Sequence, residues 1–199
     1  MSQSKTVNQI KSALLRPSLT SKFRVEIQSP STALNFFNNV TTEEFHMSCS
    51  EASLPGSSLN TQEITGDYHG VTERNAYRRM YDDRIDLTFY VEGEKYTQIR
   101  YFEDWINFIV GDNIHDDRRR SNYTYKVKYP SDYKKIMNII KFEKDHGLNL
   151  HYTFLDAYPI AINSMPLSYG STDLLKCTVS MTYLRYIVED NTGFLDVPS

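Results

Sequence analysis

A long polar segment with no sustained apolar face occupies residues 57–83, "SSLNTQEITGDYHGVTERNAYRRMYDD". It follows "CSEASLPG" (49–56), which alternates like a strand, with Cys49 and Glu51 on one side, until Pro-Gly breaks the pattern. Two glycines near the middle of 57–83 predict the turn of a hairpin. Because such a hairpin buries no core and leaves both outer edges unpaired, we predict an arm that pairs with strands of other chains.

Alternating apolar and polar residues predict the strands of the body beside this arm. Each strand has one apolar and one polar face, which is typical of antiparallel sheets with one solvated side. The segment 133–143 fits a strand or a helix, and its β-branched and aromatic residues favour a strand. The other predicted strands are "KFRVEIQ" (22–28), "RIDLTFYV" (84–91), "NYTYKVKY" (122–129), "LNLHYTFL" (148–155) and "KCTVSMTYLRY" (176–186).

One main helix is predicted at "IRYFEDWINFIVG" (99–111), where Phe102, Trp105, Ile106 and Ile109 recur at helical spacing. We expect Phe102, Trp105 and Ile106 to be core anchors, with the helix covering an open end or edge of the sheets. The predicted fold class is therefore mainly β: an antiparallel β-sandwich or barrel-like core with one flanking α-helix and a long hairpin arm.

The chain is predicted to be a single domain over residues 1–199, with no internal repeat and no low-complexity segment. Residues 1–16 are expected to form an N-terminal arm or short helix, and 189–199 a C-terminal tail. The segments 29–44 and 111–121 are expected to be loops or insertions.

Composition and charge exclude several function classes. The net charge is -3 with a pI near 6.0. This argues against a protein that binds nucleic acid through an overall positive charge, but not against a protein past which nucleic acid moves. The two cysteines, Cys49 and Cys177, lie at strand-like positions, where a free thiol behaves as a small apolar residue. No run approaches the roughly 18 apolar residues of a membrane span, so we expect no membrane insertion and folding in a reducing cytoplasm.

Two groups of residues are candidate metal ligands. His146, His151 and Asp156 do not converge, because strand positions five apart point to opposite faces. The acids of "YDDRID" (81–86) suggest a two-metal nuclease, but Arg84 between them is typical of a solvated strand face. With no P-loop, GxSxG, HExxH or paired CxxC motif, we predict no enzymatic activity, no cofactor and no metal.

The order of motifs resembles the tail tube proteins of contractile-tailed bacteriophages, which are related to the tube proteins of type VI secretion. The resemblance covers roughly residues 17–188, and its most specific parts are the "CSEASLPG" segment and the C-terminal stretch from "AYP" to "MTY". It rests on "FRVEI", "FHMSCSEASLPG", "RNAYRRMYDDRIDLTFY", "YFEDWINFI", "YTYKVKYP" and "YTFLDAYPIAINSMPLSYGSTDLLKCTVSMTYLRY".

This resemblance implies a structural virion protein. It implies hexameric rings that stack into the inner tail tube, with hairpins from all six subunits pairing into a barrel around the lumen. The implied partners are other copies of the chain, the tail sheath protein, baseplate and tail-terminator proteins, and phage DNA that passes without specific binding. The implied location is the phage tail, assembled in the host bacterial cytoplasm.

The arm carries five acids and three arginines, a local balance of -2. Because a polyanion moves most freely past a neutral or acidic wall, we expect the acids to dominate the lumen face and the arginines to lie between subunits, paired with carboxylates. The residues concerned in the hairpin are Glu63, Asp67, Glu73, Arg74, Arg78 and Arg79.

Other functions remain open at this point. The extra segments at 29–44 and 111–121 also fit a tube-like component of the baseplate hub or of the tail terminus. A different class is a monomeric β-sandwich binding module, in which 57–83 is a ligand loop. An enzyme would require a role for Asp82, Asp83 or Asp86 that assembly does not explain.

Overall fold

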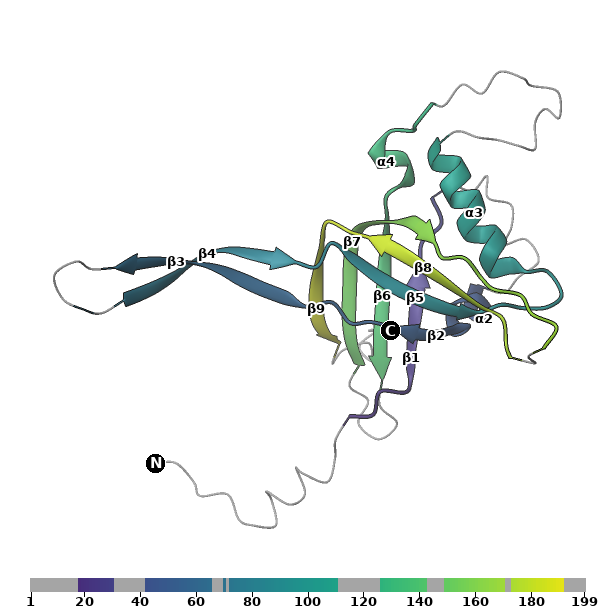
Figure 1. The fold of residues 1–199 in the computed structure, drawn as a ribbon, viewed down its shortest axis with the longest axis horizontal. Coiled ribbons are helices and arrows are strands. Elements are labelled where there is room, and N and C mark those ends of the chain that lie inside the picture. The colour runs from purple at the N-terminus through teal and green to yellow at the C-terminus, as the bar shows by residue number, and fades with distance from the viewer. Residues whose placement is uncertain are drawn as a thin grey trace, which may run out of the picture.

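The fold is mainly β, as the sequence predicts, and its body consists of two antiparallel layers that share one long strand (Figure 1). The computed structural model describes residues 18–30, 42–65, 70, 72–110, 126–142, 149–170 and 173–191. Within these ranges the body strands follow the order β1-β6-β7-β8-β5-β2, with β9 beside β7. Strands β3 and β4 form a separate two-stranded sheet.

The first layer joins β1 (Phe23–Ile27), β6 (Lys135–Phe142), β7 (Asn149–Ile162) and β9 (Arg185–Asn191). Val25 and Ile27 are buried, as their alternation predicts. Met137 and Ile139 are buried with the same period of two. The segment that fitted either a strand or a helix is therefore a strand, because this period places one face of it in the core.

The second layer joins β2 (Cys49–Ala52), β5 (Arg84–Tyr90), β8 (Lys176–Thr182) and the second half of β7. Its register shifts between Cys49 and Glu51, which pair with Phe89 and Thr88 respectively. Cys49 is therefore buried while Glu51 is exposed. The simple alternation predicted for 49–54 is wrong at this point, because an irregular register separates the two residues.

β7 bends from one layer into the other. Its pairing with β9 ends at Leu155 and Arg185, and its pairing with β8 begins at Tyr158 and Thr182. Asp156 lies between these two pairs with a φ of 59°. This left-handed conformation is more accessible to Asp and Asn than to other side chains, and it breaks the extended path of the strand.

β8 continues the register of β9 along β7 as far as Pro159, and the β7–β8 register then shifts between Pro159 and Ala161. The segment 176–186, predicted as one strand, is thus divided into two strands by Tyr183 and Leu184. β9 continues to Asn191, so the expected tail is wrong for residues 189–191, which belong to the sheet.

Three helices lie within the described residues: α2 (Thr42–Met47), α3 (Thr97–Val110) and α4 (Pro130–Tyr133). α3 packs beside β7 and β8 with Phe102 and Trp105 fully buried, whereas Ile106 is half-buried. Tyr101, one turn before Trp105, is the further large side chain that α3 buries. None of the helices described here has both the length and the apolar character that crossing a membrane requires.

Two further predicted segments differ from the structure. The strand expected over 122–129 is absent from Lys126 onward, where Lys128 N–H donates to the carbonyl of Ile109 at 2.9 Å and Pro130 then begins a short helix. The loop expected over 29–44 is wrong at its end, because α2 begins at Thr42. The predictions for 1–16, 111–121, Asp67 and His146 fall outside the described residues.

Candidate assembly interface

A two-stranded arm projects away from the two layers of the body (Figure 1). It consists of β3 (Ser57–Thr65) and β4 (Thr72–Tyr81), the hairpin that the sequence predicts over 57–83. Every residue of β3 is exposed, and β4 is exposed as far as Arg79. Among the described residues, each of the two strands pairs only with the other, so both outer edges of the arm present backbone groups without a strand partner.

The register of the arm contains one irregularity. Asn60 pairs with Arg78, whereas the next residue of β3, Thr61, pairs with Ala76. Tyr77 is therefore an extra residue of β4, and alternation along β3 continues without interruption. An extra residue of this kind increases the local twist of the two strands.

The two faces of the arm follow from this register, because directly paired residues point to the same face. The Thr61 face contains Ser57, Leu59, Thr61, Glu63 and Thr65 with Tyr81, Arg79, Ala76, Arg74 and Thr72. The Gln62 face contains Ser58, Asn60, Gln62 and Ile64 with Met80, Arg78, Asn75 and Glu73.

The charges of the arm do not divide by face as the sequence hypothesis expected. Glu63 lies on the Thr61 face and forms an ion pair with Arg74 of the same hairpin, with 2.6 Å between Arg74 Nη2 and Glu63 Oε1. Glu73 pairs in register with Ile64 and lies on the opposite face. An acidic set that includes both Glu63 and Glu73 cannot dominate one face, so that hypothesis is wrong for these two residues. Asp67 is outside the described residues.

An aromatic cluster fixes the root of the arm to the body. The rings of Tyr81 and Tyr186 meet edge to face at 5.4 Å between centroids. The guanidinium carbon of Arg79 lies 4.8 Å from the centroid of the Tyr81 ring and 5.4 Å from that of Tyr186, within the range of cation–π attraction. Arg79 Nη2 also donates to Ser57 Oγ at 3.3 Å and to Tyr186 Oη at 3.4 Å. These contacts orient the base of the arm.

Polar contacts close the other side of the root. The backbone N–H of Gly56 donates to Asp82 Oδ2 at 2.7 Å, and Thr182 Oγ1 donates to the carbonyl of Asp83 at 2.7 Å. A Cβ atom at Gly56 would lie 3.1 Å from Asp82 Oδ2, which is a tight contact. The sequence makes Asp82 and Asp83 candidate metal ligands. The side chain of Asp82 and the backbone carbonyl of Asp83 instead hold the entry to and exit from the arm.

The remaining acid of the "YDDRID" segment also makes a structural contact. Asp86 Oδ1 accepts a hydrogen bond from Ser180 Oγ at 2.5 Å, which joins β5 to β8. Within the part of the chain that the structure describes, no three His, Cys, Asp or Glu side chains gather as a possible metal site.

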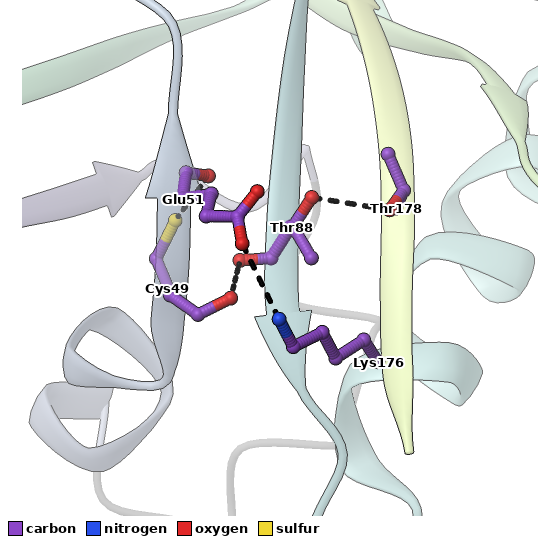
Figure 2. Close-up of polar contacts among 6 residues, drawn as sticks. Cys49, Glu51, Thr88, Lys176 and Thr178 are labelled. Carbon is purple, nitrogen blue, oxygen red and sulfur yellow. Dashed lines mark hydrogen bonds and ion pairs between the residues drawn. The ribbon is translucent and has the colours of Figure 1, made fainter. Parts of the chain in front are cut away.

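The outward side of the second layer carries a cross-strand polar network (Figure 2). Ser50 Oγ donates to the carbonyl of Thr88 at 3.1 Å, and the hydroxyls of Thr88 and Thr178 lie 3.1 Å apart. Lys176 Nζ lies 3.3 Å from Glu51 Oε1. Polar side chains and one backbone carbonyl here pair with one another across three strands, which is typical of a structural sheet surface.

The two thiols belong to β2 and β8 and are buried in the core. Burial raises the pKa of Cys49 to about 12 and that of Cys177 to about 11. Because the thiolate is the reactive form, neither side chain is placed to act as a nucleophile near neutral pH. Both are free cysteines, in keeping with their apolar strand positions.

An exposed apolar feature lies in the connection between β7 and β8. Leu167, Tyr169 and Leu174 are all strongly exposed. This connection lies on the side of the body away from the arm (Figure 1). Exposed apolar side chains gathered in one segment are typical of a protein–protein contact.

Comparison with known families agrees with this arrangement. The sequence profile of the family described as phage tail tube protein matches residues 18–189. The chain belongs to the phage tail tube protein family. The match covers the arm, its root and all the described strands but the last two residues of β9. The proteins of this family are structural tube proteins, not enzymes.

Several solved structures share the fold of this tail tube protein. A chain of the PVC extracellular contractile injection system, in its sheath/tube terminator structure, is 17% identical with a TM-score of 0.56, over 87% of this chain and 97% of that one. A chain of the PVC sheath-tube complex is 18% identical with a TM-score of 0.55, over 94% and 99%. A chain of the anti-feeding prophage tube-terminating cap is 16% identical with a TM-score of 0.56, over 88% and 92%. No curated protein sequence matches the chain.

Proposed function

We propose that this tail tube protein forms hexameric rings that stack into the inner tube of a contractile tail, through which DNA leaves the particle. Membership of the phage tail tube family and a fold shared with chains of sheath-tube and terminator structures support the proposal. The single observation that carries it is the arm, whose faces are exposed and whose outer edges have no strand partner among the described residues.

Closure of the arms into a ring would remove the hazard of their unpaired edges. A long unpaired edge is an aggregation hazard, and only closure into a barrel removes every edge. A head-to-tail contact between copies generates a ring when its rotation closes. Six arms arranged in this way pair each outer edge with the next arm and leave a central channel.

Further partners follow from the same assembly. The exposed Leu167, Tyr169 and Leu174 provide an apolar contact for a neighbouring ring or for the surrounding sheath. Baseplate and terminator proteins are proposed to bind the two ends of the stack, and assembly is proposed to take place in the host bacterial cytoplasm. The overall charge of -3 supports a channel that DNA passes without specific binding.

Electron microscopy and light scattering of the purified protein test this proposal. We expect six-fold rings or tubes. The matched control deletes residues 60–78 and joins Leu59 to Arg79 through Asn-Gly; these two residues are directly paired, and Asn-Gly suits a two-residue hairpin turn. This variant keeps the root and should remain a folded monomer. A full-length protein that stays monomeric at high concentration contradicts the proposal and favours a monomeric binding module.

A terminator or baseplate component is a second candidate, because the chains of the terminator and cap structures resemble this protein as closely as that of the sheath-tube complex does. The two candidates differ in whether rings propagate. Extended tubes at high protein concentration favour the main tube, whereas single rings at every concentration, also after addition of preformed tube ends, favour the terminal component.

A further inference from the structure

We propose that the Gln62 face of the arm lines the lumen of the ring and that the Thr61 face lies against the body of a neighbouring copy. This inference rests on the proposed function. It states what each face of the arm meets, the lumen or a neighbouring copy. It follows from the root, the register and the chemistry of the two faces.

The root fixes which face points toward a body. Tyr81 and Arg79 both belong to the Thr61 face by register, and both contact Tyr186 of β9. Tyr81 is also packed against the hydrophobic core. The Thr61 face therefore begins on the body of its own subunit.

The same face continues outward along the arm. β3 alternates without interruption from Ser57 to Thr65, so Leu59, Thr61 and Glu63 extend the surface that starts at the root. Nine strand residues span about 30 Å, and the arm extends beyond its own body (Figure 1). In a closed barrel one face of each strand points outward to the bodies and the other inward, so the continuation of the Thr61 face meets the next copy.

The chemistry of the Thr61 face suits a protein contact. Thr61 is paired with Ala76, and Thr65 with Thr72, which are small side chains that permit close approach. Glu63 and Arg74 neutralise each other there, so burying this face leaves no net charge beyond Arg79, which is held at the root.

The chemistry of the Gln62 face suits a channel for a polyanion. Asn60, Gln62 and Asn75 present uncharged amides, and the only charged residues of this face, among those described, are Glu73 and Arg78. One acid and one base give no net charge. Such a wall neutralises few phosphates, releases few counterions and so holds duplex DNA weakly.

The accessibility of one cysteine introduced into each variant tests the assignment. The native Cys49 and Cys177 are buried and give little background. Two matched pairs of neighbours are exposed in the subunit: Thr61→Cys with Gln62→Cys on β3, and Ala76→Cys with Asn75→Cys on β4. Each variant is treated with iodoacetamide, both as assembled rings and as dissociated subunits. Labelling is measured by mass spectrometry.

We expect Gln62→Cys and Asn75→Cys to react in rings at nearly the subunit rate. Thr61→Cys and Ala76→Cys should react about tenfold more slowly in rings than in subunits, equivalent to an opening free energy of about 1.4 kcal/mol. Loss of assembly confined to the Thr61 and Ala76 variants also supports the assignment. Reversed protection, equal protection, or loss of assembly confined to the Gln62 and Asn75 variants overturns it. Failure of the unsubstituted protein to form rings overturns the proposed function instead, and the face assignment with it.

Discussion

Trp105 is the largest fully buried side chain of the described structure, and its Nε1–H donates to the carbonyl of Tyr133 at 3.2 Å. Trp105→Ala should lower the free energy of unfolding by about 3–5 kcal/mol, because it leaves a cavity and removes this hydrogen bond. Urea unfolding of the dissociated subunit measures the loss. Ile106→Ala, at a half-buried position of the same helix, is the control and should cost less. Equal costs for the two variants would show that α3 is not anchored through Trp105.

The buried thiols predict a pH dependence of stability. Burial raises the pKa of Cys49 to about 12 and that of Cys177 to about 11 from the ordinary value of 9.0. Above pH 9.0 the unfolded thiols lose protons that the folded thiols keep, so the free energy of unfolding should fall as pH rises toward 11. Burial also raises the pKa of Tyr183 to about 12, which adds to this fall.

Urea unfolding between neutral and alkaline pH checks the thiol contribution. Cys49→Ala should make the decrease in the free energy of unfolding with rising pH shallower without abolishing it, whatever the stability of the variant at neutral pH. An unchanged slope in both Cys49→Ala and Cys177→Ala would mean that the thiols titrate alike in the folded and unfolded states.

At the level of elements, β7 depends on the left-handed conformation of Asp156. Asp156→Val should destabilise the subunit by about 1–2 kcal/mol, because a β-branched side chain crowds the backbone in this region. Asp156→Gly should be close to neutral, since glycine adopts the conformation freely. Thermal and urea unfolding of both variants tests the prediction, and a Val variant as stable as the Gly variant would argue against a strained bend.

The arm is the other element whose behaviour can be predicted. A two-stranded hairpin without a packed face is marginally stable in water. Hydrogen exchange of the dissociated subunit should therefore be fast in β3 and β4 and slow in β5 and β6. Assembly should slow exchange in both arm strands, because their outer edges gain partners. Arm amides that are equally protected before and after ring formation would contradict pairing between copies.

For the whole molecule, the charge distribution predicts weak binding of DNA. Assembled rings should retain little duplex DNA at physiological salt. Gln62→Lys should increase retention in a strongly salt-dependent way, because it places additional cations in each channel. Thr61→Lys, if it assembles, is the matched control and should leave retention unchanged. Filter binding over a series of salt concentrations measures both, and tight, salt-sensitive binding by the unsubstituted rings would count against a neutral lumen.

The sequence by itself determined the class of the fold and the existence of the arm. Period-two alternation in 84–91 predicted β5, and the helical spacing of Phe102 and Trp105 predicted α3. Both patterns reflect local geometry, since each element must turn one face to a core. The polarity of 57–83 predicted an arm without a core, again from composition alone.

Tertiary structure decided what local patterns do not encode. Register irregularities depend on the partner strand, as at the shift between Cys49 and Glu51 and at the extra residue Tyr77. Alternation alone therefore did not predict on which face of the arm Glu63 and Glu73 lie. The contact of Arg79 with Tyr186 joins residues 107 positions apart, and only the bend of β7 and the path of β9 bring them together. Which face of the arm meets a body therefore follows from long-range packing, whose free energy depends on neighbours that sequence spacing does not specify.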